Sequence, residues 1–149
     1  MKKSALLSFL FISTLTIVSC SDDDVVLDTE KPQIVINEPT AGQTFDAGEE
    51  MHLDASVTDN VELASYKIDI HFGGDGHEHK ALRDDDHVEW KYTKTGTLSG
   101  KSDEVHLHVD IPENAEEGPY HIGVFAIDKA GNENVAWVTV EIHNDEHDH

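Results

Sequence analysis

Hydrophobic and polar residues alternate along most of this chain, in short runs separated by turn-forming residues. The clearest run covers residues 51–57, where apolar side chains occupy every second position and polar ones lie between them. A period of two is that of a β-strand with one buried and one exposed face. The pattern predicts seven strands, at 33–37, 51–57, 66–72, 88–92, 105–111, 118–128 and 135–143. The only place for a helix is one short turn at 112–117, so the pattern favours an all-β sandwich.

Two local motifs refine this fold class. The stretch 111–120, which contains Pro112 and ends in Gly118-Pro119-Tyr120, resembles the corner between the fifth and sixth strands of immunoglobulin-like domains, which a tyrosine hydroxyl closes. The stretch 126–132 resembles the following turn, in which Asp accepts backbone N–H groups while Gly and Asn tolerate positive φ. The sequence therefore predicts an immunoglobulin-like antiparallel β-sandwich of about seven strands.

The N-terminus has the organisation of an export signal. Two lysines precede an apolar stretch of 14 residues, 5–18, which fits a signal peptide and is shorter than the roughly 20 residues that span a bilayer. Small and aliphatic residues lead into Cys20, the only cysteine, as in a bacterial lipobox whose thiol receives diacylglycerol, with palmitate as a typical acyl chain. The alternative is an ordinary secretory signal with an unrelated cysteine. The acidic segment after Cys20 is typical of a flexible tether and also resembles the surface-export signal of Bacteroidetes-type lipoproteins.

Charge and cysteine content exclude several classes of function. The chain has 149 residues, with 31 Asp and Glu against 10 Lys and Arg, for a formal charge of −21. Proteins that bind nucleic acid through phosphates need a basic face, and so does docking on anionic lipid, so neither is expected. A single cysteine allows no internal disulfide and no cysteine-rich zinc finger. We find no nucleophile elbow and no phosphate-binding loop, so the sequence does not predict an enzyme.

Histidine is the one residue type that suggests chemistry, with 11 in the chain. The segment 71–79 holds His71, Asp75, His77 and His79, and imidazole and carboxylate groups suit Zn²⁺ or Cu²⁺. Strand parity directs His71 and His121 outward on strands that are antiparallel neighbours in an immunoglobulin-type sheet. We therefore predict a zinc or copper site at this end of the sandwich. The expected ligands are His71, His77, His79 and His121, with Asp75 and His108 as secondary ligands.

Other interpretations of the polar residues remain open. Histidines at outward strand positions of an acidic protein also serve as ordinary surface residues. Calcium is a less favoured cofactor: Asp59-Asn60 and Asp128 with Asn132 supply oxygen ligands, but turn formation explains the same residues. Trp137 is predicted to face outward, because its alternate neighbours face the core, and could stack on a glycan. A non-catalytic glycan- or protein-binding module, or a structural spacer, is therefore the alternative function.

Several of these segments together resemble a known family. Cys20, the loop beginning at His71, the stretch 108–115 and the stretch 118–132 are similar to Bacteroidetes lipoproteins catalogued as domain of unknown function 4625. The resemblance covers roughly residues 30–143 and implies a lipid-anchored, immunoglobulin-like domain without an assigned biochemical role. His71, His77, His79, His108 and His121 fall on its histidine-bearing positions.

These observations divide the chain into four parts. Residues 1–19 are expected to be a lipoprotein signal peptide, 20–31 the lipidated Cys20 with its acidic tether, 32–143 the sandwich and 144–149 an acidic, histidine-containing tail. The predicted protein is attached to the outer membrane through lipid on Cys20, faces the cell surface and binds a transition metal without catalysis.

Overall fold

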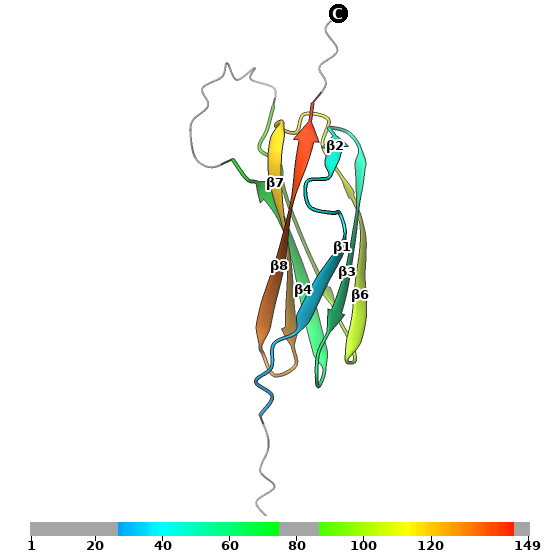
Figure 1. The fold of residues 1–149 in the computed structure, drawn as a ribbon, viewed down its shortest axis with the longest axis vertical. Helices are drawn as coiled ribbons and strands as arrows, with labels where there is room; N and C mark the ends of the chain where they lie inside the picture. The colour runs from blue at the N-terminus through cyan, green and yellow to red at the C-terminus, as the bar shows by residue number, and fades with distance from the viewer. Residues whose placement is uncertain (1–26, 75–86, 145–149) are drawn as a thin grey trace, which may run out of the picture.

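The computed structural model describes residues 27–74 and 87–144, and these form an all-β sandwich (Figure 1). Eight strands lie in two sheets, and the described part of the chain contains no helix. The strands are β1 (Gln33–Glu38), β2 (Thr44–Asp46), β3 (Glu50–Thr58), β4 (Leu63–Phe72), β5 (Lys91–Thr97), β6 (Ser102–Asp110), β7 (Gly118–Asp128) and β8 (Glu133–His143). The prediction of an immunoglobulin-like β-sandwich is confirmed.

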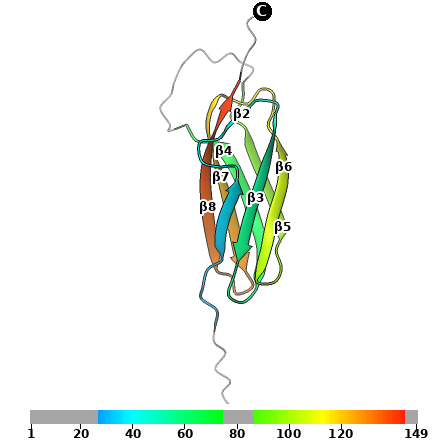
Figure 2. The ribbon, with the colours of Figure 1, turned by 45° about the vertical axis from the view of Figure 1, so that its right-hand side comes forward.

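The two sheets differ in size. One has the strand order β1-β3-β6 and the other the order β2-β8-β7-β4-β5. Figure 2 shows β3 and β6 in front of the β4–β7 pair, with the strands of both layers running along the long axis. All pairs are antiparallel except β2 with β8. The N-terminal segment reaches β1 at one end of the domain, and the C-terminus leaves at the other (Figure 1).

We name these ends by the chain segments that they hold. The tether pole carries the β3–β4, β5–β6 and β7–β8 turns together with the segment entering β1. The distal pole carries the end of β4, the β6–β7 connection and the end of β8 (Figure 1). The two poles matter because the candidate ligands are distributed between them and the outer faces of the sheets.

The core lies between the sheets and follows from the alternation in sequence. All four apolar residues of the run 51–57 are buried, and on β7 the residues at 120, 122, 124 and 126 are buried too. Each large apolar side chain removed from water contributes about 1.5–3 kcal/mol, so this alternation fixes which face of each strand points inward. On β3 the residues between them are polar and point to the outer surface of the sheet, whereas on β7 the outward positions include Gly123 and Phe125.

The predicted corner is present and is closed by Tyr120. Its ring is completely buried, its hydroxyl donates to the Glu116 carbonyl over 2.9 Å, and the Trp90 backbone N–H donates to that hydroxyl over 3.4 Å. Burial raises the pKa of Tyr120, so its phenol stays neutral and able to donate.

Two features of the strand prediction are wrong. β2 was missed because it has three residues and a single buried side chain, Phe45, in a stretch flanked by turn-forming glycines. The strand expected at 88–92 begins only at Lys91, and Val88 is 47 % exposed rather than inward-facing. Val88 instead forms an isolated β-bridge to Ala115 in the β6–β7 connection. The hydrophobic pattern within 88–92 could not predict this partner, because the partner lies in a distant segment.

Candidate metal-binding sites

His71 and His121 lie side by side on the outer face of the five-stranded sheet. They are direct register partners on β4 and β7, and their ring centroids are 5.7 Å apart. This is the adjacency that strand parity predicts, because the residues flanking each histidine along its strand point into the core. Two imidazoles from segments 50 residues apart in sequence therefore share one surface.

Both rings are oriented through Nδ1. Nδ1 of His71 is 2.8 Å from Oδ1 of Asp69, and Nδ1 of His121 is 2.9 Å from Oγ1 of Thr139. In the tautomer that donates from Nδ1, the lone pair of Nε2 is available to a metal. A carboxylate or hydroxyl partner on the second nitrogen is typical of ligating histidines. The pair offers two oriented donor atoms, which is fewer than a complete zinc site requires.

The chain after β4 passes closely over this pair. A Cβ atom at Gly73 would lie 2.7 Å from Nε2 of His121, and one at Gly74 would lie 2.2 Å from the Phe72 ring. Glycine at both positions lets the backbone follow this path without displacing the His121 and Phe72 rings. The predicted ligands Asp75, His77 and His79 follow at once and lie outside the described residues, so their role as ligands stays a prediction.

His108 does not belong with His71 and His121, and its expected place beside them is wrong. β6 pairs with β3 in the three-stranded sheet, so the outward residues of β6 face away from the outer surface of the other sheet. His108 instead lies opposite His52, with ring centroids 4.3 Å apart. The physical reason is that outward positions on the two sheets of a sandwich point in opposite directions.

Glu50 joins these two rings in a three-residue group that the sequence did not reveal. Its Oε1 is 2.8 Å from Nδ1 of His108 and 3.4 Å from Nε2 of His52, and all three side chains are about half exposed or more. One candidate ligand atom from each residue lies within 4.8 Å of the other two. The hydrogen bond from His108 lowers the pKa of Glu50, which keeps the carboxylate ionised. Alternation places Glu50 and His52 outward, but only the β3–β6 register brings them to His108.

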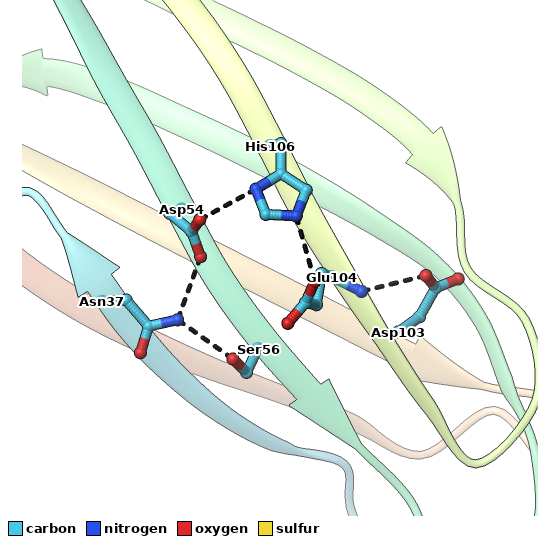
Figure 3. Close-up of polar contacts among 6 residues, drawn as sticks. All are labelled: Asn37, Asp54, Ser56, Asp103, Glu104 and His106. Atoms are coloured by element: carbon cyan, nitrogen blue, oxygen red, sulfur yellow. Dashed lines mark hydrogen bonds and ion pairs between the residues drawn. The ribbon is translucent and has the colours of Figure 1, made fainter.

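A polar network continues along the same outer face (Figure 3). His106 contacts Asp54 through Nδ1 at 2.8 Å and Glu104 through Nε2 at 3.1 Å, and Asn37 of β1 donates to Asp54 and Ser56. The hydrogen bond with Glu104, together with the charge of Asp54, raises the pKa of His106. Because both ring nitrogens already face carboxylates, His106 is a charge partner rather than a free ligand.

A separate acidic group lies at the tether pole. Asp28 precedes β1, Asp59 lies in the β3–β4 turn and Asp128 ends β7, and one carboxylate oxygen of each lies within 4.8 Å of the others. Two of these residues belong to the calcium interpretation of the sequence, and Asn60 and Asn132 hydrogen-bond to Asp28. Asp28 was missed because its position in the predicted tether gave no sign of long-range contact.

Trp137 faces outward, as the alternation on β8 indicates, and is 50 % exposed. A Cβ atom at Gly123 would lie 2.6 Å from its Cζ3 atom, so the indole covers the backbone of β7 at this glycine. With His71, His121 and Thr139 it lines a pocket of about 350 Å³. The ring is held edge-on to His71 and Phe125, at centroid distances of 5.7 Å and 5.6 Å.

Comparison with known structures shows the fold and no more. The fibronectin(III)-like modules of CbhA from Clostridium thermocellum align with 74 % of this chain and 94 % of their own length, at 17 % identity and a TM-score of 0.44. OgpA from Akkermansia muciniphila aligns at 14 % identity and a TM-score of 0.50, over 77 % of this chain and 30 % of OgpA. The sporulation control protein Spo0M from Bacillus subtilis aligns at 9 % identity and a TM-score of 0.44, over 76 % of this chain and 49 % of Spo0M.

No curated protein matches the sequence. None of the described residues form a helix long and apolar enough to cross a membrane. A family model described as "Domain of unknown function (DUF4625)" matches residues 18–143, which is most of the chain and includes the whole sandwich. The chain therefore belongs to the DUF4625 family.

Proposed function

We propose that this protein is a lipid-anchored, non-catalytic domain that binds a divalent transition metal, zinc or copper, at the cell surface. The observation that carries the proposal is the group formed by Glu50, His52 and His108, in which two imidazoles and one carboxylate place a ligand atom each within 4.8 Å of the others. Two histidines and one glutamate are a donor set that Zn²⁺ uses where one coordination position is left open. Cu²⁺ binds such nitrogen and oxygen donors more tightly than Zn²⁺ does.

The position of this group suits capture and release rather than structural binding. Its side chains are exposed, so they adjust to an ion by rotation, and water or a donor from a partner completes the coordination. Ionised Glu50 supplies negative charge, and the formal charge of −21 attracts cations to the surface. These features support a site that exchanges metal with its surroundings.

The His71–His121 pair is the second place at which we propose metal binding. Its imidazoles are more enclosed and are oriented by Asp69 and Thr139, which favours tighter binding per ligand. The remaining ligands would come from Asp75, His77 and His79, as the sequence predicts. The two places lie on opposite outer faces, so substitutions at one leave the other intact.

Lipid on Cys20 would anchor the domain by its tether pole. The segment 20–31 has 12 residues and extends at most roughly 40 Å. The domain would then stand off the outer membrane with both histidine-bearing faces accessible. Two or more acyl chains give stable attachment, at about 0.8 kcal/mol per buried methylene.

Calorimetric titration of residues 20–149, with Cys20 replaced by serine, tests the metal proposal. We expect saturable Zn²⁺ and Cu²⁺ binding that weakens at least tenfold in the His52→Ala/His108→Ala double variant, an order-of-magnitude estimate for losing two ligands. A His71→Ala/His121→Ala double variant measures how much of the metal binding depends on the His71–His121 pair. His143→Ala, at the exposed end of β8, is the matched control. The absence of saturable binding, or binding that neither double variant weakens, would contradict the proposal.

Metal affinity should also depend on pH in a defined direction. A ligating imidazole must be neutral, so protons compete with the metal as the pH falls. We expect affinity to decrease below about pH 6, near the ordinary pKa of histidine. Repeating the titration between about pH 5.5 and 7.5 measures this dependence, and unchanged affinity over that range would argue against imidazole ligands.

Trp137 supports a second candidate function, a non-catalytic glycan-binding module. One side of its indole covers Gly123, and half of the side-chain surface remains exposed beside the shallow pocket. Native gel electrophoresis in the presence of soluble glucans and mannans tests this function. Retardation that disappears in Trp137→Ala but persists in Trp90→Phe, a change in the core, supports it. Equal migration with and without polysaccharide would exclude these glycans.

A further inference from the structure

We propose that Asp28, Asp59 and Asp128 form a Ca²⁺ site that fastens the incoming N-terminal segment to the tether pole of the sandwich. The inference is independent of the transition-metal proposal, because it involves different residues, a different pole and a different class of ion. It assigns a structural role to a group that spans 100 residues of sequence, from position 28 to position 128.

Three separate segments converge on the site. Asp28 belongs to the segment before β1, Asp59 to the β3–β4 turn, and Asp128 to the end of β7. Asn60 Nδ2 donates to Oδ1 of Asp28 over 3.0 Å, and Asn132 Nδ2 donates to the Asp28 carbonyl over 3.1 Å. The N-terminal segment is therefore already seated against both turns through Asp28.

Asp59 holds a buried oxygen that has no hydrogen-bond partner among the described residues. Oδ2 of Asp59 accepts the backbone N–H groups of Val61 and Glu62, each over 2.8 Å. Oδ1 of Asp59 is buried, yet no hydrogen-bond donor among residues 27–74 and 87–144 reaches it. Buried polar atoms in native proteins are satisfied in the great majority of cases, and an exception calls for an explanation such as a bound ion. A cation at this point would satisfy the oxygen directly.

Asp128 adds a second desolvated carboxylate. It is only 2 % exposed, and both of its oxygens accept hydrogen bonds from Asn132, each over 2.7 Å. Burial favours the protonated form, but the hydrogen bonds from Asn132 and the turn backbone outweigh it and lower the pKa of Asp128. The group is therefore ionised at neutral pH. Within the described residues, no Lys or Arg forms an ion pair with any of the three aspartates.

Geometry and donor type select calcium. Oxygen ligands lie about 2.3–2.6 Å from Ca²⁺, so two of them on one ion are at most roughly 5 Å apart. The three carboxylate oxygens lie within 4.8 Å of one another, which one Ca²⁺ can span without movement of the backbone. All donors are oxygens, which disfavours Zn²⁺ and Cu²⁺. Mg²⁺ demands near-ideal octahedral geometry and usually keeps several of its waters, so a site with carboxylates from three separate segments suits Ca²⁺ better. Waters would complete the 6–8 positions that Ca²⁺ takes.

The ion would link the N-terminal segment to the sandwich, a role that we call a clasp. Extracellular calcium modules bind with dissociation constants of about 10⁻⁴–10⁻³ M. At about 10 mM Ca²⁺ such a site is saturated, and the fraction of molecules with a detached N-terminal segment falls roughly 10- to 100-fold by mass action. Calcium would thus fix the direction in which the domain leaves its tether.

Limited proteolysis of residues 20–149, with Cys20 replaced by serine, tests the clasp. Cleavage between residues 21 and 31 should slow about tenfold or more in 10 mM CaCl₂ relative to EDTA at matched ionic strength, whereas MgCl₂ should protect little. Asp28→Asn should abolish the protection, and this residue is outside the core, so the variant should still fold. Asp103→Asn is the matched control, because Asp103 also accepts turn N–H groups at this pole but is not in the cluster.

Thermal unfolding of the same chain provides a second measurement. Ca²⁺ should raise the midpoint by a few degrees in the unsubstituted protein and in His52→Ala/His108→Ala, but not in Asp59→Asn, which keeps the size of the side chain and one carbonyl acceptor. Equal midpoints in CaCl₂ and in NaCl of the same ionic strength, or a calcium effect that survives both Asp28→Asn and Asp59→Asn, would overturn the proposal. Because the double histidine variant retains the clasp, failure of one proposal is distinguishable from failure of the other.

Discussion

Tyr120 illustrates how a single buried side chain closes the β6–β7 corner. Its hydroxyl accepts from the Trp90 backbone and donates to the Glu116 carbonyl, so it joins the start of β5 to the start of β7. Burial raises its pKa, so its contribution to stability is complete below the ordinary tyrosine pKa of about 10 and is lost as the pH rises through the folded-state value. The corner is therefore sensitive to alkali but not to mild acid.

Removing this hydroxyl should destabilise the domain. We expect Tyr120→Phe to lower the free energy of unfolding by about 1–3 kcal/mol, because a buried N–H and a carbonyl lose their partner. Urea denaturation at pH 7 measures the loss. Tyr92→Phe, which also removes only a hydroxyl from a tyrosine packed against the core, is the control and should cost less. Equal losses in the two variants would mean that the corner hydrogen bonds contribute little.

His106 should titrate at a higher pH than an ordinary histidine. The hydrogen bond with Glu104 and the charge of Asp54 both favour the imidazolium, so the two interactions are strongest below the ordinary pKa and weaken as the pH rises through the folded-state value. NMR titration of the imidazole signals measures the midpoint. It should lie above about 6.5 and fall in Glu104→Gln, whereas Glu62→Gln, elsewhere on the surface, should leave it unchanged. A midpoint at or below 6.5 would contradict the contacts in Figure 3.

At the scale of elements, the short strand β2 completes the five-stranded sheet. It pairs with β8 in parallel, and Phe45, opposite Ile142, is its one buried side chain. Gly42 and Gly48, with φ of 75° and 87°, flank it in a conformation that other residues adopt only with strain. One aromatic anchor between two glycine turns is sufficient here because β8 supplies the rest of the pairing.

Shortening the Phe45 side chain should therefore lower the stability of the domain substantially, although β2 is a short strand. Phe45→Ala should lower the free energy of unfolding by about 3–5 kcal/mol, since it leaves a cavity under the sheet edge. Phe125→Ala is the matched control. It removes the same atoms from the outer face, where Phe125 contacts Trp137 and Lys67, and should cost clearly less. Chemical denaturation compares the two, and a reversed order would show that β2 is not part of the stabilising core.

At the scale of the whole molecule, excess negative charge is the dominant electrostatic feature. The formal charge of −21 belongs to the whole chain, which carries 31 Asp and Glu and only 10 Lys and Arg to oppose them. Repulsion among these charges destabilises the compact state, and salt screens it over a Debye length of about 10 Å at 0.1 M.

We expect the thermal midpoint to rise by several degrees between about 20 mM and 500 mM NaCl at pH 7, in the presence of EDTA to exclude divalent ions. The effect should shrink near pH 5, because the net charge approaches zero towards the sequence pI of about 4.5. Differential scanning calorimetry measures both dependences. A midpoint that is insensitive to salt at pH 7 would show that the charges are already compensated locally.

The candidate sites show where inference from sequence stops. Parity was sufficient to bring His71 and His121 together, because both residues lie on neighbouring strands of a familiar sandwich order. The same reasoning misplaced His108, because it fixes whether a residue faces outward but not which sheet carries the strand. The grouping of His52 and Glu50 with His108 could not be predicted without the β3–β6 register. The grouping of Asp28 with Asp59 and Asp128 could not be predicted without the path of the N-terminal segment.

The sequence by itself determined the strands with clear alternation, the inward face of each, the corner at Tyr120 and the excess of negative charge. These properties depend on neighbouring residues, and burial of apolar side chains imposes them locally. Only the tertiary structure decided the assignment of strands to sheets, the partner of Val88, the pairing of His52 with His108 and the meeting of Asp28 with Asp59 and Asp128. These contacts join distant segments, and their geometry follows from the packing of the whole sandwich rather than from any local pattern.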